Sequence, residues 1–146
     1  MNRLLLAFVL CAALLSCGKN DGRKEAAALC AEKFAHGFFN FRYVEALGYC
    51  TEDSRRVLEF CASNMSDRIV DSLRSITDTP TVSVVETVVL GDSAAECVVN
   101  VENGILADTI GGYPVPGQDD RKYRLQLVKE VKEWKVRMAG PPRSEE

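Results

Sequence analysis

The N-terminal segment decides where the rest of this chain is expected to fold. Arg3 and the free amine supply positive charge, and residues 4–15 form a continuous apolar run. A short charged region followed by a short hydrophobic region is the pattern of a secretory signal. A membrane-spanning helix needs about 20 apolar residues, and the polar residues 18–24 end this run too early. The pattern therefore predicts an exported chain, with a signal peptide in place of a transmembrane helix.

The junction after the apolar run, Leu14-Leu15-Ser16-Cys17, resembles a bacterial lipobox. This is the site at which lipoprotein signal peptides are cut and the new N-terminal cysteine is acylated. The resemblance implies that residues 1–16 are a lipoprotein signal peptide. It also implies a diacylglyceryl thioether on Cys17 and usually an amide-linked third chain. One acyl chain binds a membrane only reversibly, whereas two or three make the attachment effectively permanent. The membrane is thus the expected partner of Cys17.

Residues 17–23 are expected to be the acylated cysteine and a flexible tether, because their small and polar side chains cannot bury apolar surface. In enteric bacteria, an Asp after the acylated cysteine tends to hold lipoproteins in the inner membrane, and this chain has Gly18 there. We therefore expect a lipid-anchored protein of the bacterial cell envelope, at the outer membrane. Whether it faces the periplasm or the cell surface stays open.

The remaining chain has the size of one domain, which we place at 24–140, followed by a disordered tail at 141–146. Loss of Arg3 leaves 17 basic and 21 acidic residues, a formal net charge of −4. This balance offers no broad basic surface for nucleic acid. Apolar residues make up 47% and charged residues 27% of the chain, as in ordinary globular proteins.

Helical periodicity dominates the first half of the domain. Apolar residues three and four apart predict an amphipathic helix over 24–41, with this stripe: Ala26, Cys30, Phe34, Gly37, Phe38 and Phe41. A short helix is expected over 43–49. A third, capped by Thr51 or Asp53, is expected to run to Leu73 or Ile76. Its apolar stripe is Leu58, Cys61, Met65, Ile69, Leu73 and Ile76.

Alternating apolar residues predict antiparallel strands in the second half. The first strand places Val82, Val84, Val88 and Leu90 on one face, and the second Ala95, Cys97, Val99 and Val101. Gly91-Asp92 fits a two-residue turn between them, and Asn103-Gly104 a turn into a short extra strand. Prolines and glycines exclude a central strand over most of 105–120. The last two strands place Tyr123, Leu125 and Leu127, then Trp134, Val136 and Met138, on one face each, with a turn near Val131-Lys132.

Helices followed by an antiparallel meander predict an α+β domain with N-terminal helices packed on a curled antiparallel sheet. Two segments, 40–52 and 127–136, resemble bacterial lipoproteins with a nuclear transport factor 2-like (cystatin-like) fold, mostly uncharacterised. The first is similar to their D-Y-x-x-A-x-x-Y-x-T-x-E region, although Asn40-Phe41-Arg42-Tyr43 lacks the usual Gly-Asp. The second is similar to their L-V-K-x-D-G-x-W-K-V ending, although Val131-Lys132 replaces Asp-Gly. The resemblance implies a cone-shaped pocket. This fold serves enzymes, ligand binders and assembly modules alike, so it does not supply the function.

The cysteines leave more than one interpretation. Cys11 departs with the signal and Cys17 is acylated, which leaves four in the domain: Cys30, Cys50, Cys61 and Cys97. An oxidising envelope permits disulfides, and four cysteines allow three complete pairings. Cys50–Cys61 is disfavoured by distance if a helix begins near Asp53, and Cys61–Cys97 is easier geometrically. Positions on apolar faces favour free buried thiols, with one or more bridges as the alternative. The wide spacings disfavour a zinc site.

Candidate site residues are few. Tyr113 in the long connection, Trp134 on the last strand and Glu86 on the first could line an apolar pocket, although structural roles are the more ordinary explanation for Tyr113 and Trp134. His36, the only histidine, lies off the apolar stripe of its helix, where it needs neighbours to act in catalysis. The sequence contains no phosphate-binding loop, nucleophile elbow or metal motif, and it indicates no cofactor.

Three functions remain open at this stage. The first is a non-enzymatic lipoprotein that binds a small apolar ligand or another envelope protein. The second is an enzyme of the polyketide-cyclase or isomerase type, which needs an acid or base in the pocket. Glu86 breaks the alternation of its strand and is the one inward acid that the pattern offers. The third is an interaction module that forms a homodimer through its sheet.

Overall fold

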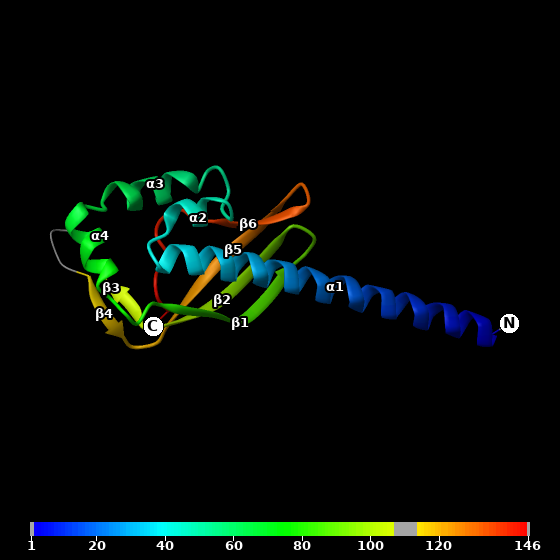
Figure 1. Cartoon of the computed structure of the whole chain (residues 1–146). Coiled ribbons are helices and arrows are strands. Elements are labelled where there is room, and N and C mark those ends of the chain that lie inside the picture. The colour runs from blue at the N-terminus through cyan, green and yellow to red at the C-terminus, as the bar shows by residue number, and fades with distance from the viewer. Residues whose placement is uncertain (1, 107–113, 146) are drawn as a thin grey trace.

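The computed structural model describes residues 2–106 and 114–145, with side chains from residue 21 onward except those of residues 106 and 118. Its helices are α1 (Asn2–Phe39), α2 (Tyr43–Leu47), α3 (Arg55–Ser63) and α4 (Asp67–Arg74). Its strands are β1 (Thr81–Leu90), β2 (Ala94–Glu102), β3 (Gly104–Leu106), β4 (Val115–Gln118), β5 (Arg121–Glu130) and β6 (Glu133–Arg137). The predicted α+β class is confirmed, with helices followed by antiparallel strands (Figure 1).

The main sheet has the strand order β1-β2-β5-β6, and each neighbouring pair is antiparallel. Strands β3 and β4 pair separately as a small two-stranded sheet. After β2 the chain leaves the main sheet, and the described parts of 103–120 form β3 and β4 before β5 pairs with β2. Prolines and glycines disfavour a central strand in this stretch. Asn103 takes a left-handed φ of 54° at the exit, which Asn tolerates better than most residues.

Helix α1 covers one face of the main sheet. Its fully buried residues include Ala27, Ala31, Phe34 and Ala35. They meet Cys97, Val99, Leu125, Leu127 and Val136 from three strands, all buried in the same core. The helix face is turned slightly from the predicted stripe, because Ala27 is buried and Ala26 is exposed. Three alanines on this face let the helix approach the sheet closely.

A β-bulge in β1 overturns part of the predicted strand pattern. The register shifts between Val84 and Glu86, so that Val84 opposes Val99 but Thr87 opposes Cys97. One extra residue in a strand exchanges its two faces beyond the bulge. Val88 and Leu90, expected to face inward, are therefore 40% and 53% exposed. Glu86 is exposed as well, so its predicted inward orientation is wrong.

The long third helix is two helices. Helix α3 ends at Ser63, and α4 begins after Ser66, whose side chain caps it by accepting from the amide of Ile69. Serine competes for backbone hydrogen bonds and so favours a helix start over a helix interior. The predicted cap of α3 is also wrong, because neither Thr51 nor Asp53 caps it and its N-cap Ser54 makes no side-chain capping bond.

Regular backbone structure continues at both ends of the domain. Residues 18–23, expected to be a tether, continue helix α1, and Arg23 pairs with Asp92 in the β1–β2 turn at 3.1 Å. Propagating a helix costs far less than starting one, so polar residues between two helical stretches are carried along. At the other end, the amide of Glu145 donates to the carbonyl of Lys122 at 2.8 Å. Ser144 and Glu145, which belong to the segment expected to be a tail, therefore lie beside β5.

The two hairpin turns differ from each other. Leu90 pairs with Ala94, so the β1–β2 loop has three residues, Gly91-Asp92-Ser93, where two were predicted. The β5–β6 turn holds only Val131 and Lys132, and Val131 takes a φ of 56°. A β-branched residue rarely adopts this left-handed conformation, which glycine would occupy without strain.

Candidate binding groove

Of the three predicted pocket residues, the two that the structure describes, Trp134 and Glu86, do not come together. Trp134 is 6% exposed in the core beneath α1, where the ammonium of Lys129 lies 5.9 Å from its ring centroid. Glu86 lies on the opposite, exposed face of the sheet. Tyr113 falls outside the described residues. Trp134 is therefore a packing residue, and the enzyme hypothesis loses the inward acid on which it rested.

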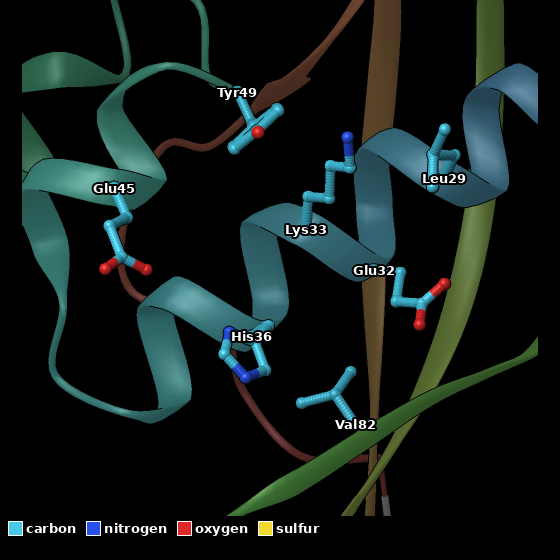
Figure 2. Close-up of a pocket in the computed structure, with 7 residues that line it drawn as sticks. All are labelled: Leu29, Glu32, Lys33, His36, Glu45, Tyr49 and Val82. Carbon is cyan, nitrogen blue, oxygen red and sulfur yellow. The ribbon is translucent and has the colours of Figure 1, made fainter.

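A groove instead crosses the solvent-facing side of α1, with a volume of about 510 Å³. Its lining comes from three elements: Leu29, Glu32, Lys33 and His36 of α1, Glu45 and Tyr49 at α2, and Val82 of β1. Figure 2 shows these seven side chains. Leu29 is 51% exposed, and Val82 and Tyr49 are half-buried. The groove thus combines apolar contacts with both signs of charge.

The reversal that brings α2 beside α1 depends on the end of the first helix. The amide of Arg42 donates to the carbonyl of Gly37 at 2.8 Å, and that of Phe41 donates to Phe38 at 3.1 Å. With Phe41 at a φ of 60°, these bonds form a Schellman motif, which usually has glycine at this place. A β-carbon on Gly37 would lie 3.0 Å from the amide nitrogen of Ala46, so glycine permits the close contact. This contact sets Glu45 and Tyr49 beside α1.

Polar contacts fix the two sides of the groove. The side-chain amide of Asn40 donates to the carbonyl of His36 at 2.8 Å and to that of Pro80 at 3.2 Å. It therefore ties the end of α1 to the start of β1, just before Val82. On the other side, the ammonium of Lys33 lies 5.8 Å from the ring centroid of Tyr49, a cation–π distance. Glu45 pairs with Arg42 at 3.7 Å.

The arrangement suits binding better than catalysis. His36, Glu32 and Lys33 are all exposed, and the groove is open to solvent. Catalytic sites usually exclude water from the reacting groups, whereas these three side chains stand in solvent. Among the described residues, no three His, Cys, Asp or Glu side chains are grouped closely enough to hold a metal ion.

A second cluster, of aromatic rings, gathers at the C-terminal end of α1. Phe38 contacts Phe34, Phe39 and Tyr43 with ring centroids 5.3–5.7 Å apart, and Phe39 contacts Tyr123 at 4.4 Å. Burial raises the pKa of the Tyr43 hydroxyl, and the neighbouring Cys61 raises it further. The hollow beside Phe39 and Tyr123 is only about 20 Å³. It has room for about one water molecule, so this cluster extends the core.

The four domain cysteines are free thiols in this structure. The Cys61–Cys97 bridge, which the sequence offered as the alternative to free thiols, is not present in it. Cys97 is fully buried beneath α1 and lies 3.6 Å from the hydroxyl of Thr87, whereas Cys61 is half-buried on α3. Burial raises the pKa of both thiols. The sequence placed both on apolar faces, but these faces belong to different parts of the core.

Sequence reasoning missed most of the groove. The four-residue spacing of Glu32, His36 and Asn40 places these polar side chains on one face of α1. Nothing in the local pattern indicates that this face lies beside Tyr49 or Val82. Those neighbours come from the chain reversal at Phe41 and from the position of β1. Among family models, curated proteins and solved structures, none matches this chain.

Proposed function

We propose that this chain is a lipid-anchored lipoprotein of the bacterial envelope whose α+β domain is nuclear transport factor 2-like and binds another envelope protein in the groove across α1. The lipobox-like Leu14-Leu15-Ser16-Cys17 supports the anchor. The order of helices and antiparallel strands supports the fold. The observation that carries the binding role is the groove itself, an open hollow of mixed apolar and charged lining.

A protein segment suits the groove better than a small apolar ligand. Pockets that hold small molecules bury most of the ligand surface, whereas this groove is open and Leu29 stands half out of it. Charges of both signs at Glu32, Lys33 and Glu45 can pair with a partner chain along its length. Such complementarity adds more to specificity and to the association rate than to affinity.

The anchor leaves the groove accessible. Helix α1 projects beyond the sheet toward the N-terminus (Figure 1), and the groove lies on the part of the helix that covers the sheet. Cleavage before Cys17 would leave the helix to begin at the acylated residue. At about 1.5 Å per residue, Leu29 would then stand roughly 18 Å along the helix axis from Cys17. A partner could reach the groove without entering the bilayer.

Two measurements test this proposal on the full chain in a bacterial host. Mass spectrometry of the membrane fraction should find acyl chains on Cys17, and Cys17→Ala should release the chain from membranes. A photo-crosslinking residue at Leu29 should give an adduct of defined mass that one at Glu59, exposed on α3, does not give. Glu32→Lys should weaken the Leu29 adduct several-fold. An unmodified Cys17 contradicts the anchor, and equal adducts at both positions contradict the groove.

A specific observation favours homodimer formation as a second candidate. Strand β1 is an edge of the main sheet, and Val85, Val88 and Leu90 are 51%, 40% and 53% exposed along it. Edge strands with exposed apolar residues pair readily with another chain. Sedimentation of the full chain in detergent should then show a dimer that Val85→Lys converts to a monomer. A wild-type monomer at all concentrations would remove this candidate.

A further inference from the structure

We propose that Cys30 and Cys50 form a disulfide when the chain meets a disulfide oxidant, which clips the middle of α1 to the edge of the main sheet. The pairing follows from the structure alone. Its occurrence in cells rests on the proposed export to the envelope, where disulfides form and persist.

Cys50 is held at the outer edge of β6 as if it belonged to a further strand. It makes a parallel bridge to Val136: the amide of Val136 donates to the Tyr49 carbonyl at 2.8 Å, and the Thr51 amide donates to the Val136 carbonyl at 2.9 Å. Side chains of directly paired residues project to the same face of a sheet. Val136 is fully buried on the face that α1 covers, so the Cys50 side chain points toward α1.

Cys30, on α1, contacts the same edge of the sheet through its sulfur. Its sulfur lies 3.1 Å from the Trp134 carbonyl oxygen and 3.7 Å from the Tyr49 carbonyl oxygen. The second carbonyl belongs to the peptide bond that joins Tyr49 to Cys50. Backbone dimensions therefore place the Cys30 sulfur within roughly 6.5 Å of the Cys50 α-carbon. The two residues are 7% and 8% exposed, so both side chains are buried at this edge of the sheet. The Cys50 sulfur lies 3.6 Å from the Leu47 carbonyl oxygen.

The competing partner for Cys30 is Cys97: after burial, both Cys97 and Cys50 raise the pKa of the Cys30 thiol, and the effect of Cys97 is the larger. The positions of the strands decide between the two. Cys97 belongs to β2, and β5 separates that strand from β6. With about 4.8 Å between neighbouring strands, β2 is roughly 10 Å from β6 and still farther from Cys50. Because the Cys30 sulfur contacts carbonyls at β6 and beyond its outer edge, Cys50 is the better-placed partner. Cys61 lies elsewhere, on α3 beside Tyr43.

The chemistry is thiol–disulfide exchange with a protein or glutathione disulfide as the oxidant. The thiolate of one cysteine attacks the oxidant, forms a mixed disulfide and displaces one thiolate. The thiolate of the second cysteine then attacks the mixed disulfide, which forms the Cys30–Cys50 bond and releases the second thiolate. The two cysteines lose two protons and two electrons, and the oxidant leaves as two thiols. Because burial raises the pKa of both thiols, exchange is expected while the chain folds or opens.

The clip would also steady the proposed groove. Tyr49 forms one side of the groove and directly precedes Cys50, while Leu29 on α1, the helix that the groove crosses, directly precedes Cys30. A bond between the two cysteines therefore fixes the Tyr49 side relative to α1. Closing a chain loop of this length should raise the midpoint of thermal unfolding by on the order of 10 °C.

The test uses the purified full chain in detergent. The chain is first reduced and then treated with oxidised glutathione. Free thiols are alkylated, and the chain is digested with trypsin in the absence of reductant. Cleavage after Lys and Arg places each cysteine in a separate peptide: Cys30 in 25–33, Cys50 in 43–55, Cys61 in 57–68 and Cys97 in 75–121. We expect a linked pair of 25–33 with 43–55, kept in Cys61→Ala and Cys97→Ala. Oxidation should raise the unfolding midpoint of the wild type but not of Cys50→Ala. A link from 25–33 to 75–121, or alkylated thiols in both 25–33 and 43–55, would overturn the pairing.

A parallel digest of chain taken from acid-quenched cells separates this inference from the proposed function. The same spectra report the acyl chains on Cys17. An acylated chain whose purified form does not link Cys30 to Cys50 contradicts the inference and leaves the anchor standing. A linked chain without acyl groups contradicts the anchor and supports the pairing.

Discussion

Two regions of this molecule use amphipathic helices in opposite ways. Helix α1 lies on the sheet and buries Ala27, Ala31, Phe34 and Ala35 completely. Helix α4 is also amphipathic in sequence, yet none of its residues is buried, and Ile69 and Leu73 are only half-covered. The two helices have different neighbours in the fold (Figure 1). Helix α1 spans the main sheet, whereas α4 lies near the small β3–β4 sheet. Periodicity thus shows which face of a helix is apolar, but a partner surface decides how much of it is buried.

The largest expected difference between the regions is in the cost of losing one apolar side chain. Phe34→Ala should lower the free energy of unfolding by about 3–5 kcal/mol, because it opens a cavity in a fully packed core. Leu73→Ala on α4 is the matched test and should cost at most about 1 kcal/mol, because solvent already reaches that side chain. Urea unfolding of both variants measures this. Similar costs would mean that α4 is as well covered as α1.

The pH dependence of stability should also report on the packed region. Burial raises the pKa of the Cys30 thiol from 9.0 to about 11. The folded chain then holds this proton after the unfolded chain has lost it. The contribution of the protonated Cys30 thiol to the free energy of unfolding is fully present below pH 9 and is lost as the pH rises toward 11. The expected loss is about 2–3 kcal/mol at Cys30. Urea unfolding of reduced protein across this range, compared with Cys30→Ala, isolates the effect, and equal slopes in both proteins would contradict it.

One buried polar pair joins the start of α3 to the chain that follows β6. Ser54 and Thr51 are 0% and 1% exposed, their hydroxyl oxygens are 2.7 Å apart, and Ser54 accepts from the Met138 amide at 2.8 Å. Ser54→Ala removes the hydrogen-bond partner of the Met138 amide and of the Thr51 hydroxyl. It should lower the free energy of unfolding by about 1–3 kcal/mol, measured by urea unfolding. Ser63→Ala, on the exposed end of α3, is the control and should change stability little. A neutral Ser54→Ala would show that α3 is not held to the sheet through this contact.

The smallest expected effect is a gain in stability. Val131 is 98% exposed at a φ of 56°, so its side chain adds strain without packing. Val131→Gly should raise the free energy of unfolding by about 1 kcal/mol, because a left-handed backbone at a β-branched residue is costly. Lys132→Gly in the same turn should be neutral or slightly destabilising. If Val131→Gly destabilises the chain, the β5–β6 turn is not strained as its backbone suggests.

Local patterns predicted much of the packed region. Alternation in β2, β5 and β6 correctly placed Cys97, Leu125 and Val136 inside, because strands without irregularities keep a period of two. In β1 the bulge at Val85 changed the face of every later residue. The one local sign of it was Glu86, which breaks the alternation and was interpreted as an inward acid. The same bulge moved Glu86 out of the predicted pocket.

The groove was harder to predict than the core. Its residues come from α1, α2 and β1, and they meet only because Gly37 and Phe41 turn the chain back and Asn40 joins the helix to β1. The proximity of Cys30 to Cys50 has the same origin. Cys30 and Cys50 come close because Cys50 forms a backbone bridge to Val136. Neither the segment around Cys50 nor the segment around Val136 specifies that bridge by itself.

The sequence by itself determined the α+β class, the order of helices and strands and the inner faces of three strands, because these follow from residue periodicity. It also supplies the Leu14–Cys17 pattern on which the proposed anchor rests. Only the tertiary structure decided which apolar faces are covered, where β1 changes face and which cysteines are neighbours. Those outcomes depend on how closely α1 can approach the sheet and on contacts between distant segments, and the free energy of such contacts is not written in any local stretch of chain.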